Sequence, residues 1–411
     1  MKVLVINAGS SSIKYQLYQM PQEKVCAKGF VERIGEETSQ LSHSYNGKTH
    51  CIEQKVQDHK EAMELILESL VSSEIGVIEH ISEIGAVGHR VVHGAEEFTG
   101  SVIIDKNVIA SIEKFADLAP LHNPANLTGI KAARHNLPKA KQVACFDTAF
   151  HTTIPQVAYM YALPYELYAK YGIRRYGFHG ISHRYVARRA AKLLNKGKYE
   201  VNLITCHLGN GCSVTAVKGG KSADTSMGFT PLEGLVMGTR SGDFDPAILL
   251  YLINKGYDAK TLNAVCNKQS GLFGISGLSN DMRNLSELAS KGNERAKLAI
   301  EIFCYRIRKY IGSYMAILNP LDAIIFTGGI GENAVEIREM ACGELVQVGI
   351  ELDSQKNHAI VGTQGQINSL SSRVKVFVIP TNEELAVAKD TFELTWKRVT
   401  VLNPNKMLRS Y

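Results

Sequence analysis

The sequence has no C-x-x-C pair, no H-E-x-x-H or G-x-S-x-G motif, and no apolar run near the ~18 residues of a membrane-spanning helix. These absences argue against a site built on paired cysteines, a zinc or serine hydrolase, and a membrane-embedded chain. The eight cysteines are scattered, and we expect reduced, mostly buried thiols. No long Lys/Arg run marks a nucleic-acid surface, and a net charge of +6 suits small anionic substrates better.

The length of 411 residues exceeds what one hydrophobic core usually serves, which favours two domains of about 150 to 250 residues. The first apolar run stops at Asn7, so it is shorter than the roughly 7 to 15 apolar residues of a secretory leader. We therefore expect a cytoplasmic protein.

The stretch VLVINAGSSSIKYQLY, residues 3–18, predicts a strand, a tight turn and a second strand. Lys14 falls inside the second strand, whereas a P-loop lysine would open a helix. The amides around Gly9, the hydroxyls of Ser10 and Ser12, and the Lys14 ammonium could converge on one anion. An ordinary hairpin is the simpler interpretation of this stretch taken alone.

A second segment, NLITCHLGNGCSVTAVKGGKSADT at residues 202–225, repeats this order of strand, Gly/Asn turn and alternating strand. Helical periodicity follows in both halves of the chain, at residues 59–70 and 184–194, then at 295–318 and 333–340. The pattern predicts two duplicated α/β domains around a cleft. We place the boundary near His151, before the loop at Pro155.

The stretch AIIFTGGIGEN, residues 323–333, predicts a buried strand, a glycine-rich segment and a helix beginning near Asn333. Such glycines allow a ligand to approach the backbone closely. An ordinary strand-to-helix turn with Asn333 as the N-cap explains the pattern equally well.

Arginines and histidines beside glycines form a further group: Arg90, His93, His179, His183 and Arg240. Glycine-framed arginines with histidines nearby suit a phosphoryl group. Lone histidines such as His43 receive no functional role.

Two acidic residues, Asp147 and Glu383, follow apolar strands, where α/β folds bind ligands. Glu383 could instead cap a helix.

Ordered motifs cover nearly the whole chain: NAGSSSIKY, GHRVVHG, PLHNP, FDTAFH, YGFHG, CHLGNG, MGFTPLEGL, MGTRSGD, GGIGEN and PTNEE. In these motifs the sequence closely resembles the acetate kinase family. The resemblance implies an α/β fold of two duplicated ribonuclease H-like domains with a nucleotide cleft between them, as in the sugar kinase, heat-shock chaperone and actin superfamily. It implies an N-terminal domain at 1–151, to which residues 386–411 return, and a C-terminal domain at 152–385 with the nucleotide site and the dimer interface.

Residue roles follow from the same resemblance. It implies that Arg90, Asp147, His179 and Arg240 are catalytic, with Arg90 on the substrate carboxylate, and that Asn7 and Glu383 place Mg²⁺, for which Mn²⁺ can substitute. A methyl-sized substrate pocket would be walled by Val92, Leu121, Phe178 and Pro231. ATP or ADP would be held by Ser10, Ser12, Lys14, His207, Leu208, Gly209, Asn210, Gly211, Asp281, Met282, Arg283, Gly329, Ile330, Gly331, Glu332 and Asn333.

The implied reaction is reversible transfer of the ATP γ-phosphoryl group to acetate, giving acetyl phosphate and ADP, by a homodimer with no nucleic-acid or membrane partner. A carboxylic acid is already ionised at neutral pH, so Asp147 is expected to orient an arginine or the metal's water shell rather than remove a proton. The alternatives are a propionate or other short-chain acyl kinase and, with less support, a non-enzymatic ATP switch of the actin type. Acid-dependent release of ADP would distinguish the kinases from the switch.

Overall fold

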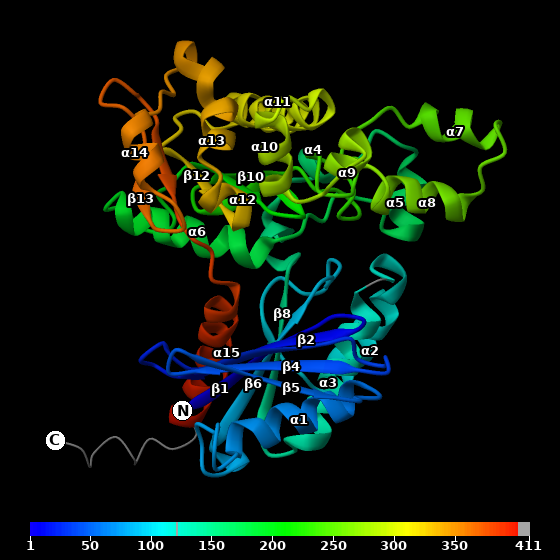
Figure 1. The fold of residues 1–411 in the computed structure, drawn as a ribbon, viewed down its shortest axis with the longest axis vertical. Coiled ribbons are helices and arrows are strands. Elements are labelled where there is room, and N and C mark those ends of the chain that lie inside the picture. Colours follow the sequence, from blue (N-terminus) through cyan, green and yellow to red (C-terminus); the bar gives the residue numbers. More distant parts are fainter. Residues whose placement is uncertain (121, 402–411) are drawn as a thin grey trace. The chain divides into compact units, whose positions relative to one another are not determined.

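The computed structural model describes residues 1–120 and 122–401, without the side chains of residues 397–401. The chain forms two compact units, each built on its own sheet (Figure 1). Unit 1 comprises Met1–Ala149 and the segment that begins at Asn382, and unit 2 comprises Phe150–Thr381.

The sheet of unit 1 has the strand order β5-β4-β3-β2-β1-β6-β8-β7. Strands β1 to β5 form an antiparallel meander, and β1, β6 and β8 run parallel. The strands are β1 (Lys2–Ala8), β2 (Ser12–Gln19), β3 (Lys24–Glu32), β4 (Ser39–Tyr45), β5 (Lys48–Gln54), β6 (Ile84–Val91), β7 (Val102–Ile103) and β8 (Lys141–Phe146).

Helices cover both faces of this sheet: α1 (His59–Val71), α2 (Lys106–Lys114), α3 (Asn123–Asn136) and α15 (Glu383–Val401), with 3-10 turns at Ile81–Glu83 and Phe115–Leu118. Val87 of β6 belongs to the core that includes residues of α1 and α3. Its neighbour Gly88 faces α15, since a Cβ there would lie 2.3 Å from Thr391 Oγ1. Successive strand residues point to opposite faces, so α15 covers the face opposite to α1 and α3.

The sheet of unit 2 has the order β11-β10-β9-β12-β14-β13. Its strands are β9 (Leu203–Leu208), β10 (Cys212–Lys218), β11 (Lys221–Thr225), β12 (Ala323–Thr327), β13 (Gly365–Gln366) and β14 (Lys375–Val378). Its helices are α4 (Gln156–Tyr159), α5 (Tyr165–Tyr171), α6 (Gly180–Leu193), α7 (Ala247–Ile253), α8 (Ala259–Lys268), α9 (Gly271–Ser276), α10 (Met282–Ser290), α11 (Glu294–Ile317), α12 (Gly328–Asn333), α13 (Val335–Cys342) and α14 (Ser354–Ala359), with 3-10 turns at Ala149–Thr153 and Gly343–Val348.

The two sheets share one pattern of strands. The order β3-β2-β1-β6-β8 in unit 1 corresponds to β11-β10-β9-β12-β14 in unit 2, with the same sequence of antiparallel and parallel pairs. The predicted α/β class with duplicated halves is therefore confirmed.

The helix predicted to begin near Asn333 corresponds to α13, but the prediction missed a further helix directly before it. The glycine-rich segment is itself helical, as α12, and α13 begins at Val335 after Ala334. The reason is local: the Glu332 carboxylate accepts a hydrogen bond from the Gly328 N–H at 2.8 Å, so the helix begins directly after β12. The other predicted helices lie in α1, α6 and α11, with α6 beginning earlier than expected, at Gly180.

Candidate active site

The opening stretch is a hairpin, as its residue pattern predicts. β1 pairs with β2 up to Ala8, and Lys14 stands opposite Asn7. The turn is closed by the Gly9 N–H, which donates to Ser12 O at 2.8 Å. His59 Nε2, from α1, lies 2.7 Å from Gly9 O and holds the turn from outside.

The carboxyl ends of β6 and β8 bring Arg90 and Asp147 together. Arg90 donates from Nη2 to Asp147 Oδ2 at 2.6 Å and from Nε to Asp147 Oδ1 at 3.2 Å. The first residue of α15, Glu383, lies 3.7 Å from Arg90 Nε through its Oε2. Arg90 thus lies between two carboxylates from two other elements, and the Asp147 side chain is only 2% exposed.

This group sets two carboxylates against one guanidinium, and these charges affect the pKa values of Arg90 and Glu383. Desolvation raises the pKa of Glu383 to about 7; Arg90 opposes the rise, and Asp147 and Glu384 add to it. Burial alone would lower the pKa of Arg90, but the carboxylates of Asp147 and Glu383 raise it overall. Lys14 also acts on Glu383, so the ammonium of the hairpin lies near the same carboxylate.

A buried asparagine, Asn126 of α3, joins two strand ends of unit 1 and was missed by the sequence reasoning. Its Oδ1 accepts from the Val92 N–H at 3.0 Å, just after β6, and its Nδ2 donates to Ala8 O at 2.8 Å, the end of β1. Asn126 therefore fixes the end of the Asn7 strand against the end of the Arg90 strand. The signal available was its place two residues after the motif PLHNP.

The predicted substrate-pocket residues are divided between the units. Val92 belongs to unit 1, whereas Phe178 and Pro231 belong to unit 2, and Val92 and Phe178 are both buried. Leu121 lies outside the described residues. The methyl-sized pocket stays a prediction.

His179 and Arg240 of unit 2 meet at the turn between β9 and β10. A Cβ added at Gly211 would lie 3.4 Å from His179 Nε2 and 3.6 Å from Arg240 Nη1, so both side chains border this glycine. The His179 ring packs against that of His207, with centroids 4.3 Å apart, and its Nδ1 lies 2.9 Å from Ser213 Oγ. His179 has a left-handed backbone with φ of 57°, which turns the chain into α6.

Arg240 has no carboxylate partner among the residues that the structure describes. Its Nη1 donates to Pro231 O at 3.0 Å and lies 3.5 Å from Met237 Sδ. Burial lowers the pKa of the guanidinium, because no described carboxylate offsets the desolvation of its charge. A partly buried arginine with neutral neighbours is suited to bind an anion.

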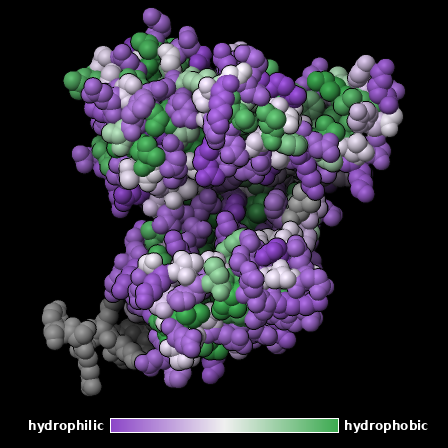
Figure 2. Space-filling model, in the orientation of Figure 1, coloured by the Kyte–Doolittle hydropathy of each residue, from purple (hydrophilic) through white to green (hydrophobic). Residues whose placement is uncertain are grey.

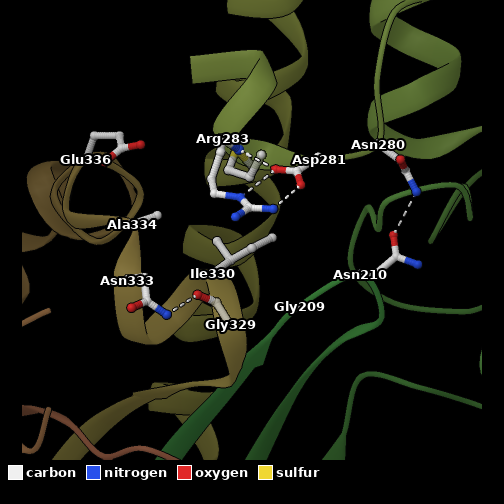
Figure 3. A pocket seen from close by; sticks show the side chains of 11 residues that line it. Gly209, Asn210, Asn280, Asp281, Arg283, Gly329, Ile330, Asn333, Ala334 and Glu336 are labelled. Atoms are coloured by element: carbon white, nitrogen blue, oxygen red, sulfur yellow. Dashed lines mark hydrogen bonds and ion pairs between the residues drawn. The ribbon is translucent and has the colours of Figure 1, made fainter. Parts of the chain in front are cut away.

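A pocket of about 720 Å³ lies between the β9–β10 turn, the start of α10 and α12 (Figure 3). It brings together eight of the predicted nucleotide residues: Gly209, Asn210, Asp281, Met282, Arg283, Gly329, Ile330 and Asn333. In Figure 3 the Arg283 guanidinium is held by the Asp281 carboxylate, with a shortest distance of 2.7 Å. The Arg283 side chain is 90% exposed, so a ligand can reach it.

Five predicted nucleotide residues of unit 2 do not line this pocket: His207, Leu208, Gly211, Gly331 and Glu332. Leu208 is fully buried in β9, and the Glu332 carboxylate turns back to the N–H groups of Gly328 and Thr381. The pocket adds three residues that the sequence reasoning missed: Asn280, Ala334 and Glu336. All three are close in sequence to predicted ones, which was the only signal for them.

A family model described as the acetokinase family matches residues 2–389. The chain belongs to this family. Acetate kinase from Thermotoga maritima is 58% identical over 97% of this chain and 99% of its own length. Among solved structures, an acetate kinase from Porphyromonas gingivalis superposes with a TM-score of 0.92 at 46% identity, covering 96% of this chain and 99% of its own.

Another solved member of the structural group is a propionate kinase from Francisella tularensis, with a TM-score of 0.89 at 46% identity over 96% of this chain and 99% of its own. The resemblance drawn from the motifs is confirmed. The family assignment rests on the comparisons with known proteins. The pocket of unit 2 is defined by the structure alone, so it is an independent observation.

Proposed function

We propose that the chain is an acetate kinase, which transfers the γ-phosphoryl group of ATP to acetate and forms acetyl phosphate and ADP. The observation that carries this proposal is the nearly full-length likeness to acetate kinases at 53–58% identity. The test is formation of acyl phosphate from ATP and acetate, trapped as a hydroxamate by hydroxylamine. No acetate-dependent hydroxamate with purified protein would contradict it.

The Arg90–Asp147 pair is our proposed site for the acetate carboxylate. The nucleophile is an anion approaching a triphosphate, so like-charge repulsion is the main obstacle to reaction. Arg90 supplies the attraction, and the two hydrogen bonds that it donates to Asp147 fix the plane of the guanidinium. Acetate needs no base, so we assign Asp147 an orienting role.

We assign stabilisation of the transferring phosphoryl group to His179 and Arg240. The support is their shared position at Gly211 and the absence of a carboxylate partner for Arg240 in the described part of the chain. The hairpin residues Ser10, Ser12 and Lys14 and the turn at 207–211 are our proposed phosphate contacts. We assign adenosine to the 720 Å³ pocket beside Arg283 and Ile330.

We propose Mg²⁺ as the metal, with Mn²⁺ as a substitute, held by Asn7 and Glu383. Amide and carboxylate oxygens are the hard donors that Mg²⁺ prefers, and Mg²⁺ commonly takes only one or two protein ligands beside phosphate oxygens and water. The described residues contain no cluster of three or more metal-binding side chains, which fits a metal bound mainly through the nucleotide. When bound, Mg²⁺ would neutralise phosphate charge. Asn7→Asp and Glu383→Ala should each change the Mg²⁺ concentration for half activity.

A propionate kinase is the second candidate, because a propionate kinase structure is as similar in sequence as the acetate kinase structure. The same hydroxylamine assay with acetate, propionate and butyrate separates the two. A higher kcat/KM for propionate than for acetate would favour the second candidate.

We propose two domains. The first comprises residues 1–151 and the segment from about residue 386, and the second comprises residues 152–385.

We also propose a homodimer through the second domain. Its support is α7, with sequence AILLYLI, in which no residue is buried and Leu250 is 65% exposed. Hydrophobic side chains are visible on the part of unit 2 that carries this helix (Figure 2). Light scattering should give twice the protomer mass, and Leu250→Glu should lower it.

We propose a cytoplasmic location. None of the eight cysteines, all of them in the described part of the chain, forms a disulfide, as expected in a reducing compartment. Within the described residues, no helix combines the length and the apolar character needed to cross a bilayer.

A further inference from the structure

A single buried hydroxyl lies between two histidine rings in unit 2. Ser213, on β10, is 0% exposed. Its Oγ lies 2.9 Å from His179 Nδ1 and 2.7 Å from His183 Nε2. One serine thus contacts both the ring assigned to the phosphoryl group and a second ring behind it.

The donor and the acceptor of each of these hydrogen bonds can be assigned by starting from the group that lies farthest from His179. His183 is buried, and desolvation, with His151 and His207 nearby, holds its pKa well below the usual value, so the ring is neutral with one N–H. Its Nδ1 lies 2.7 Å from Thr205 Oγ1. The Thr205 hydroxyl can donate to the Thr215 carbonyl, 3.5 Å away, and we assign the single proton of His183 to Nδ1 on this arrangement, with the Thr205 oxygen as its acceptor.

His183 Nε2 is then an acceptor, and Ser213 must donate its only proton to it. The Ser213 oxygen therefore accepts from His179 Nδ1–H. This bond fixes the rotation of the His179 ring and directs Nε2 toward Gly211, beside Arg240 Nη1.

We propose that Ser213 is a positioning residue for His179, held in its own orientation by His183 and Thr205. The inference rests on the proposed phosphoryl transfer. Ser213 does not touch the substrate in this scheme; it acts only through the ring of His179. With Nδ1 carrying the proton of the neutral ring, Nε2 can donate to an anionic phosphoryl group only when His179 is an imidazolium.

A double-mutant cycle tests this role, using the wild type, Ser213→Ala, His179→Ala and the double variant. Ser213→Ala should lower kcat by about 10- to 100-fold, with the KM values for acetate and ATP changed by less than about twofold, because a loosely held ring is misplaced in the transition state. In the His179→Ala background, Ser213→Ala should leave kcat unchanged.

A matched control is Ser39→Ala in unit 1. Ser39 is also buried, at 1% exposure, and its hydroxyl donates to Arg33 O at 2.8 Å. Its loss should lower the melting temperature and leave kcat unchanged.

The split between kcat and KM is the second readout, since a purely structural loss would lower the melting temperature without acting on kcat alone. Unchanged kcat in Ser213→Ala, or an equal loss in both backgrounds, would overturn the positioning role.

A direct measurement does not depend on activity. In ¹⁵N-histidine-labelled protein, NMR should show His183 with its proton on Nδ1, and a proton on Nε2 would overturn the assigned direction. Failure of the proposed function looks different: the wild type would form no acyl phosphate, while the NMR result for His183 would still hold.

Discussion

The hydrogen bonds between Arg90 and Asp147 predict a specific effect of Asp147→Asn. An asparagine keeps one oxygen but places an NH₂ group opposite a donor of Arg90, so the bond now at 2.6 Å is lost. A hydrogen bond to a charged group contributes about 1.5 to 3 kcal/mol, which corresponds to a loss of roughly 10- to 150-fold in kcat/KM for acetate. The loss should appear with acetate and leave the ATP KM nearly unchanged, since only the orientation of Arg90 is affected.

The assay is the hydroxamate trap at varied acetate and saturating ATP, with the melting temperature measured in parallel. A useful control is Glu287→Gln, which breaks the exposed Glu287–Lys291 pair on α10 and should not change the kinetics. If Asp147→Asn has wild-type kcat/KM for acetate, the orienting role is refuted. If instead the variant abolishes an acidic limb of the pH profile, Asp147 acts as a base and our assignment is wrong.

Three further predictions concern single residues. Arg240→Ala should lower kcat by at least about 100-fold and change the ATP KM far less, because the Arg240 charge has no carboxylate partner in the described part of the chain. Steady-state kinetics with varied ATP measures both quantities, and an unaltered kcat would remove Arg240 from the mechanism. Val92→Ala should raise kcat/KM for propionate relative to acetate. If Val92 only packs in the core, the variant should lose stability and keep the same acid preference. Competition between the two acids distinguishes these results. Burial lowers the pKa of His89 to about 4. Between pH 6.5 and 4 the unfolded chain therefore binds a proton at this residue that the folded chain does not bind. The free energy of unfolding should fall by up to about 3 kcal/mol as the pH falls through this window. His89→Gln should make the midpoint of urea unfolding less dependent on pH between 6.5 and 4. An equally steep dependence in the variant would show that the effect does not come from His89.

The sequence predicted the local structure well where neighbouring residues alone determine it. The hairpin at residues 3–18 followed from alternation around Gly9, and its placement of Lys14 in a strand is confirmed. The helix over the glycines of 328–331 was not predictable from propensity, since glycine disfavours helices and the compensating bonds come from Glu332. Asn126 was missed for a related reason: its partners, Ala8 and Val92, are distant in sequence and meet only in the folded unit.

Motif spacing alone also could not tell which nucleotide residues face a cavity. Glu332 sits within a motif and was expected at the ligand, yet its carboxylate binds backbone groups, while Glu336, outside that motif, lines the pocket. The direction of a side chain depends on the bonds that it makes after folding, which residue order does not contain.

The inward turn of Glu332 also has a consequence for the start of α12. The first N–H of this helix, which in many nucleotide-binding proteins would meet a phosphate, is already bonded to the protein's own carboxylate at 2.8 Å. The same carboxylate oxygen accepts from the Thr381 N–H at 3.0 Å. Glu332 therefore saturates this end of the helix from within, and an anion placed at Gly328 would meet a negative charge in place of an open donor.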